Sequence, residues 1–148
     1  MNGAESHMPA TQGAWRDRRD AAVRAYFEWM PVREQPDGRI WRRFSFGDLA
    51  DLVMLDTRLW ARPMQLPGGS PGINDPRRTL LGDDQERWLL ESLGTSTAQW
   101  KLVGQQVRMA ALTPKYNTDA WEGYPAARDR FLQALQRMRT RDVAVLTG

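Results

Sequence analysis

The sequence predicts an α/β fold in which short strands are separated by helices. The hydrophobic pattern gives the order helix, two strands, helix, strand, helix, strand, and this alternation favours a layered α/β domain over an all-α or all-β one. The chain has 148 residues, of which 41% are hydrophobic, close to the commonest size of a single domain. We therefore expect residues 1–148 to form one domain or part of one.

The first predicted element is a helix over residues 14–30, after a small and polar loop at 1–13. Pro31 ends this helix, because a proline disfavours the helical conformation in the residue before it. Arginines and aspartates fill the other face, which predicts a solvated, ion-paired surface. The apolar side chains recur at spacings of three and four, as an amphipathic helix requires: Trp15, Ala22, Val23, Tyr26, Phe27 and Met30.

Two strands are predicted next, at 40–46 and 52–55, and a short connection at 47–51 makes a hairpin the economical arrangement. The second strand is apolar at four consecutive positions. Such a run is typical of a strand that is buried on both faces of a sheet.

The remaining elements follow a long irregular loop over 61–82, which holds four prolines and four glycines. A helix then begins at Asp83 or Asp84 and ends at Gly94. The last elements are a strand at 100–104, a loop at 113–125, a helix at 126–139 and a strand at 143–146. The seven tryptophans are spread along the chain, and we expect them to anchor the core and the loops.

Composition excludes several kinds of site. The chain has no cysteine, which removes disulfides, thiolate zinc sites and a cysteine nucleophile, and its one histidine, His7, nearly excludes a Ser/His/Asp triad or a multi-histidine metal centre. His7 lies in a polar loop, where it is either simply exposed or beside an active site. No export signal or membrane span is present, so we expect a soluble chain with no membrane partner. The net charge is +3, but the cations are interspersed with acids, so we expect no nucleic-acid partner.

The sharpest candidate site residues are Asp56 and Arg58, which directly follow the apolar strand at 52–55. Open α/β sheets bind ligands at the carboxyl ends of their strands. Asp56 could orient Arg58 so that its guanidinium meets an anionic ligand with fork geometry. Alternatively, Asp56 caps a turn and Arg58 pairs with it structurally.

Gln105 and Gln106 follow the strand at 100–104 in the same way. Their amides could hydrogen-bond a phosphate, a metal-bound water or the backbone of the neighbouring loop. Backbone contact is the commonest use of such side chains. We take Asp56, Arg58, Gln105 and Gln106 together as candidates that either support a site from behind or lie on its substrate side, and we assign no catalytic residue and no metal ligand.

Several stretches, taken in order, resemble the PhoD-like alkaline phosphatases, also called alkaline phosphatase D. The matches cover most of the chain, and their order makes them far more specific together than singly. They are GAESH at 3–7, AYFEWMPVR at 25–33, FSFGDLADLVMLDTR at 44–58, LGDDQERWL at 81–89, WKLVGQQ at 100–106 and WEGYPAAR at 121–128.

The resemblance implies part of a four-layer α/β/β/α metallophosphoesterase sandwich that hydrolyses phosphate mono- and diesters with calcium and iron. The metals of such enzymes bind phosphoryl oxygens and supply a hydroxide-like nucleophile. The family's metal ligands lie in an Asp-His-Glu stretch that would fall just before Met1 and in a Gly-Asp-x-His motif of which Gly148 would be the glycine. We therefore expect an internal fragment, with no cofactor bound by this chain.

These observations lead to one main functional hypothesis and two alternatives. The main one is the middle portion of a metal-dependent phosphoesterase, inactive in isolation, whose full-length form acts on a phosphoester substrate in the periplasm or outside the cell, as the family implies. The first alternative is a noncatalytic phosphate- or polyanion-binding module. The second is a genomic remnant with no present activity.

Overall fold

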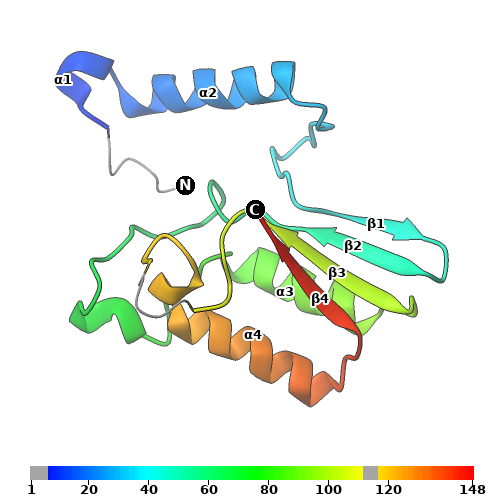
Figure 1. Cartoon of the computed structure of the whole chain (residues 1–148). Helices are drawn as coiled ribbons and strands as arrows, with labels where there is room; N and C mark the ends of the chain where they lie inside the picture. The colour runs from blue at the N-terminus through cyan, green and yellow to red at the C-terminus, as the bar shows by residue number, and fades with distance from the viewer. Residues whose placement is uncertain (1–6, 112–116) are drawn as a thin grey trace.

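The computed structural model describes residues 7–111 and 117–148, and it confirms the predicted order of helices and strands (Figure 1). Two short 3-10 helices and one short α-helix lie within the predicted loops. In chain order the elements are α1 Pro9–Gln12, α2 Trp15–Trp29, β1 Arg42–Phe46, β2 Ala50–Met54, η1 Pro71–Asn74, α3 Asp83–Gly94, β3 Trp100–Gln105, η2 Trp121–Gly123, α4 Pro125–Met138 and β4 Val143–Thr147.

The four strands form one sheet in the order β1-β2-β3-β4. β1 and β2 are antiparallel and make the predicted hairpin, whereas β2, β3 and β4 are parallel. The crossover from β2 to β3 contains α3, and the crossover from β3 to β4 contains α4. Parallel strands need such long connections, and the helices in them cover a face of the sheet.

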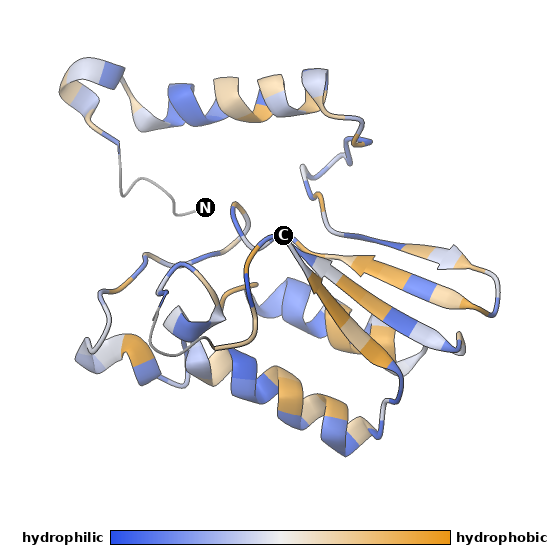
Figure 2. Cartoon of the chain, in the orientation of Figure 1, coloured by the Kyte–Doolittle hydropathy of each residue, from blue (hydrophilic) through white to orange (hydrophobic). Residues whose placement is uncertain are grey.

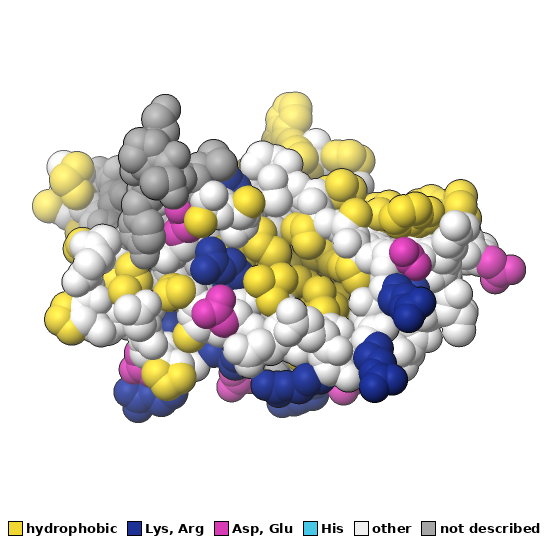
Figure 3. All heavy atoms as spheres, turned by 60° about the horizontal axis from the view of Figure 1, so that its bottom comes forward, with side chains coloured by type: hydrophobic (Ala, Val, Ile, Leu, Met, Phe, Trp, Pro, Cys, Tyr) yellow, Lys and Arg dark blue, Asp and Glu magenta, His cyan; other side chains and the backbone are white. Residues whose placement is uncertain are grey.

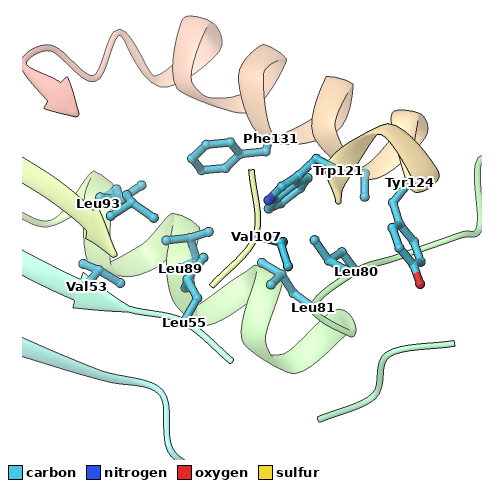
Figure 4. Close-up of a cluster of buried hydrophobic side chains, with 12 residues drawn as sticks. Val53, Leu55, Leu80, Leu81, Leu89, Leu93, Val107, Trp121, Tyr124 and Phe131 are labelled. Carbon is cyan, nitrogen blue, oxygen red and sulfur yellow. The ribbon is translucent and has the colours of Figure 1, made fainter. Parts of the chain in front are cut away.

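The core lies between this sheet and the two crossover helices (Figure 4). Val53 and Val103 are fully buried on the inner face of the sheet, and the register places them side by side. Leu89 of α3 and Phe131 of α4 pack against them from the other side. Figure 2 shows the matching hydrophobic stripes on the two helices.

The opposite face of the sheet is apolar but poorly covered. Phe44, Phe46, Trp100 and Leu146 all belong to this face by strand alternation, and each is at least 44% exposed. Figure 3 shows that hydrophobic side chains also come to the surface in the middle of another face of the molecule. We call the apolar, exposed side of the sheet its open face.

The open face corrects one prediction from the sequence. Leu52 and Met54 were expected to be buried like their neighbours, because the strand is apolar throughout, but both are only half-buried. Val53 and Leu55, which point to the helices, are 0% and 1% exposed. The pattern therefore identified a strand that could be buried on both sides, whereas among the described residues its full burial is confined to the side of Val53 and Leu55.

Helix α2 is separate from this core. It has the predicted amphipathic pattern, but none of its residues is buried. In Figure 1 it lies apart from the sheet, beyond the end at which β2, β3 and β4 finish. Its arginines are partly paired with acids, as expected, through the Arg19–Asp20 and Arg24–Glu28 ion pairs.

The tryptophans differ in burial between the core and helix α2. Trp41 and Trp121 are buried, and Trp41 contacts Trp60 and Trp88. Trp29 was expected to anchor the fold but is 85% exposed, because it lies at the end of the unburied helix α2. Within the part of the chain that the structure describes, no helix is long and apolar enough to cross a membrane.

Candidate functional site

The candidate residues lie where the parallel strands finish. Asp56 and Arg58 follow β2, Gln105 ends β3, and Gln106 follows it directly. Because β2 and β3 are parallel and adjacent, these segments leave the sheet at the same edge, which is where open α/β sheets bind their ligands. We call this region the carboxyl edge.

Asp56 builds a tight turn at this edge. Its side chain is buried, and its carboxylate accepts hydrogen bonds from three successive backbone N–H groups: Oδ1 from Arg58 at 2.9 Å and Leu59 at 2.8 Å, and Oδ2 from Trp60 at 3.1 Å. The turn-capping interpretation of Asp56 fits this geometry. Asp56 therefore orients the backbone of Arg58, and the Arg58 guanidinium bonds to a different carboxylate.

Two glutamine amides hold the chain on either side of Asp56. Gln106 Oε1 accepts hydrogen bonds from the Thr57 N–H at 2.9 Å and hydroxyl at 2.7 Å, while its Nε2 donates to the Leu55 carbonyl at 2.6 Å. Gln85 on α3 accepts from the Asp56 N–H at 2.7 Å and donates to the Asp56 carbonyl at 2.9 Å. These amides replace the ladder partners that a strand loses when it leaves a sheet.

The Arg58 guanidinium pairs with Asp119, which lies in the loop before η2. Arg58 Nη1 is 2.8 Å and 2.7 Å from the two carboxylate oxygens of Asp119. Arg62 Nη2 lies 2.7 Å from Asp119 Oδ1, so this carboxylate is shared between two arginines. The cluster of Arg58, Arg62 and Asp119 carries one net positive charge.

Arg62 anchors this cluster in the protein. It is 8% exposed and donates to the Thr57 carbonyl at 3.1 Å, to the Tyr124 hydroxyl at 3.2 Å and to Asp119. Partial burial acts to raise the pKa of Asp119, but the hydrogen bond from Arg58 and the charge of Arg62 outweigh it and lower that pKa below its ordinary value. Asp119 is therefore ionised at neutral pH.

Gln105 is buried and used differently from Gln106. Its Oε1 accepts a hydrogen bond from the Trp121 indole N–H at 2.5 Å, whereas its Nε2 has no hydrogen-bond partner within residues 7–111 and 117–148. Among the described residues, the hydrogen bond of the Gln105 side chain goes to Trp121 and not to Asp56 or Arg58. The structure thus brings Asp56, Thr57 and Gln106 together and leaves Gln105 on the core side of the edge.

His7 lies near the start of α2. Its Nε2 is 2.9 Å from the Gly13 carbonyl oxygen, and its Nδ1 is 3.4 Å from Arg18 Nη1. Its ring also packs against Trp15, with 5.3 Å between the ring centroids. A hydrophobic pocket along α2 is lined by His7, Trp15 and Tyr26 together with Leu59 of the carboxyl edge.

The residues of the carboxyl edge do not form a metal site. Both oxygens of Asp56 are occupied by backbone N–H groups, and both oxygens of Asp119 face arginines. Across residues 7–111 and 117–148, no group of three or more His, Cys, Asp or Glu side chains could hold a metal ion. The calcium and iron implied by the family resemblance therefore do not fit the described side chains.

Comparison with known proteins identifies the family. The model of the family described as PhoD-like phosphatase matches residues 1–148. The chain belongs to the PhoD-like phosphatase family. It is 39% identical to alkaline phosphatase D of Bacillus subtilis (strain 168), and the match covers 88% of this chain and 25% of that protein.

A solved structure titled "Structure of PhoD" has a fold similar to that of this PhoD-like chain. The TM-score is 0.78 at 39% sequence identity, and the match covers 88% of this chain and 28% of the solved one. The α/β fold and the family expected from the sequence are thus confirmed. The chain spans about a quarter of the length of the curated relative that it matches.

Three residues of the carboxyl edge were missed by the sequence analysis. Gln85 had a usable signal: it lies four residues before Leu89 on the apolar stripe of α3, and a polar side chain on such a stripe has to find buried partners. Arg62 and Asp119 had none. Both lie in irregular loops, where no periodicity indicates which residue a side chain will meet.

Proposed function

We propose that this chain is the scaffold portion of a PhoD-like phosphoesterase that hydrolyses phosphate mono- or diesters, and that it is inactive without the rest of the enzyme. The proposal rests on the match of the PhoD-like phosphatase family model to residues 1–148, together with the 39% identity to a quarter of a relative named alkaline phosphatase D. We extend that relative's named activity to the enzyme to which this chain corresponds. Export to the periplasm or the outside is part of the same proposal.

The proposal divides the chemistry between this chain and the remainder of the enzyme. In the family, calcium and iron would activate a nucleophile and neutralise charge on the leaving oxygen. The described residues offer no cluster of His, Cys, Asp or Glu side chains for such ions. This chain instead contributes the sheet, its carboxyl edge and the arginine cluster at that edge.

The open face of the sheet supports the idea that the chain works as part of a larger body. An exposed row of Phe44, Phe46, Trp100 and Leu146 is costly in water and prone to association. A sheet in a layered α/β protein is normally covered on both sides. The three quarters of the relative that this chain does not span provide ample sequence for a second cover.

A transplant experiment tests the proposed function. The matching quarter of Bacillus subtilis alkaline phosphatase D would be replaced by residues 1–148 of this chain, and p-nitrophenyl phosphate hydrolysis would be measured with added calcium and iron. We expect activity from the chimera and none from the isolated chain. A folded chimera without activity, or an isolated chain with it, would contradict the proposal.

The polyanion-binding alternative has less support. Arg19 and Arg24 of α2 are paired with acidic neighbours on the same helix, so they do not form an uncompensated basic stripe. If this alternative were correct, binding of the chain to nucleic acid would weaken steeply as salt is raised. We expect no such salt-dependent binding in a filter or fluorescence assay.

A further inference from the structure

The Arg58 guanidinium has an unused hydrogen-bonding edge, and we propose that this edge binds a tetrahedral oxyanion of the phosphate class. Arg58 holds Asp119 through Nη1 alone, and no described residue accepts a hydrogen bond from its Nε or Nη2. The Arg58 side chain is 48% exposed, so this edge is accessible. The Nε and Nη2 donors form a fork that matches two oxygens of one phosphorus.

Two other arginines of the chain show what a closed fork looks like. Arg77 gives Nε and Nη2 to the two oxygens of Asp75, at 3.1 Å and 2.8 Å. Arg130 gives the same two nitrogens to the oxygens of Glu86, at 3.0 Å and 3.1 Å. Each of these forks is filled by a carboxylate of the protein itself, whereas the corresponding edge of Arg58 is not.

The open fork is held in place from both ends. The turn capped by Asp56 fixes the backbone of Arg58, and the carboxylate of Asp119 fixes its Nη1. Asp119 is in turn held by the buried Arg62. A guanidinium positioned before the ligand arrives loses less conformational entropy on binding, which favours affinity.

The charge balance of the cluster also favours an anion. Arg58 and Arg62 together carry two positive charges, and Asp119 neutralises one of them, so the cluster keeps one positive charge facing solvent through Arg58. It lies at the carboxyl edge, where open α/β sheets bind ligands. Asp119 is a positioning residue here, because it acts through Arg58.

The choice of ligand rests on the proposed function. An inorganic phosphate ion and the phosphoryl group of an ester offer the same pair of oxygens, so both should bind the fork. One arginine fork supports only weak binding, with an expected dissociation constant on the order of millimolar. Binding is measured without catalysis, so the proposal can fail while the proposed function stands, and the reverse also holds.

A direct test follows the arginine Nε–H signals of the ¹⁵N-labelled chain by NMR. Inorganic phosphate and phenyl phosphate would be titrated separately, with chloride at matched ionic strength as the control. We expect a saturable shift of the Arg58 Nε–H signal with both phosphates and none with chloride. Replacement of Arg58 by Lys keeps the charge but removes the fork, and it should weaken binding about tenfold.

Arg77→Lys is the matched control, because it changes an exposed arginine whose fork is already filled by Asp75. It should leave the affinity for both phosphates unchanged. Equal shifts with phosphate and chloride, a shift with inorganic phosphate alone, or unchanged binding in Arg58→Lys would each overturn the proposal. The titration of the unmodified chain decides the matter even if Arg58→Lys does not fold.

Discussion

The two faces of the sheet differ in how completely they are covered. The face that meets α3 and α4 carries Val53 and Val103, both 0% exposed, whereas the open face carries Phe46 at 58% and Leu146 at 50%. The covered face also carries buried polar side chains such as Asp51 and Gln105, so a lack of apolar residues does not explain the exposure of the open face. The covering elements explain it, because α3 and α4 pack against the middle of one face and leave the apolar side chains of the other face exposed.

The largest expected effect separates the covered face from the open one. Phe131→Ala removes a buried ring between α4 and the sheet, and it should lower the free energy of unfolding by about 4 kcal/mol. Phe46→Ala on the open face should change it by about 0.5 kcal/mol or less. Urea denaturation followed by circular dichroism measures both, and equal losses would show that the open face is covered in solution.

The buried amide of Gln85 gives the next largest effect. Gln85→Leu would keep the side-chain volume but leave the Asp56 N–H and carbonyl without their partners, at a cost of about 3 kcal/mol. Gln133→Leu on the exposed side of α4 is the control and should be nearly neutral. Thermal melts of both variants provide the measurement, and a neutral Gln85→Leu would show that the paired hydrogen bonds between Gln85 and Asp56 do not stabilise the fold.

Asp51 predicts a pH dependence for the covered side of the sheet. The hydrogen bond from Arg43 and those from Ser45 and Ser96 outweigh burial and hold the pKa of Asp51 well below its usual range. A carboxylate with a lowered folded-state pKa stabilises the protein above its unfolded pKa, and this contribution is lost as pH falls below about 4.

Replacing Asp51 by Asn should therefore remove part of the acid sensitivity. We expect a loss of about 1–2 kcal/mol at pH 7 and a flatter dependence of stability on pH between about 4 and 2. Denaturation midpoints at several pH values measure this slope. A variant with the slope of the unmodified chain would show that other carboxylates control acid unfolding.

The smallest expected effect on stability comes from polar substitutions on the open face. Phe46→Ser combined with Leu146→Ser should change the free energy of unfolding by about 0.5 kcal/mol or less, because neither side chain is buried. The same pair should clearly reduce binding of an apolar fluorescent dye and self-association. An unchanged dye signal would place the exposed apolar surface elsewhere.

The elements of the fold could be predicted from the sequence because their signals are local. The apolar spacing of residues 14–30 and the consecutive apolar run at 52–55 each depend on side chains within a few positions of one another. The burial of those elements could not be predicted in the same way. Trp29 and Leu52 have apolar neighbours in sequence, but their exposure depends on what packs against them from elsewhere.

In the candidate site too, the position of a residue along the chain could be predicted, whereas its partner from a distant loop could not. Arg58 could be placed at the carboxyl edge, because it directly follows an apolar strand. Its carboxylate partner could not be identified, since Asp119 lies 61 positions away in a loop without periodicity. Asp56 was the nearer acid in sequence, but its oxygens are taken by the backbone of the turn that it caps.

The hydrogen bonds between Gln85 of α3 and Asp56 in the turn after β2 make the carboxyl edge depend on the docking of α3. Gln85 and Asp56 are 29 positions apart, and their paired hydrogen bonds can form only once α3 has docked on the sheet. The amide proton of Asp56 should consequently be protected from exchange with deuterated solvent until α3 undocks from the sheet. The turn at the carboxyl edge is therefore as stable as the docking of α3 on the sheet.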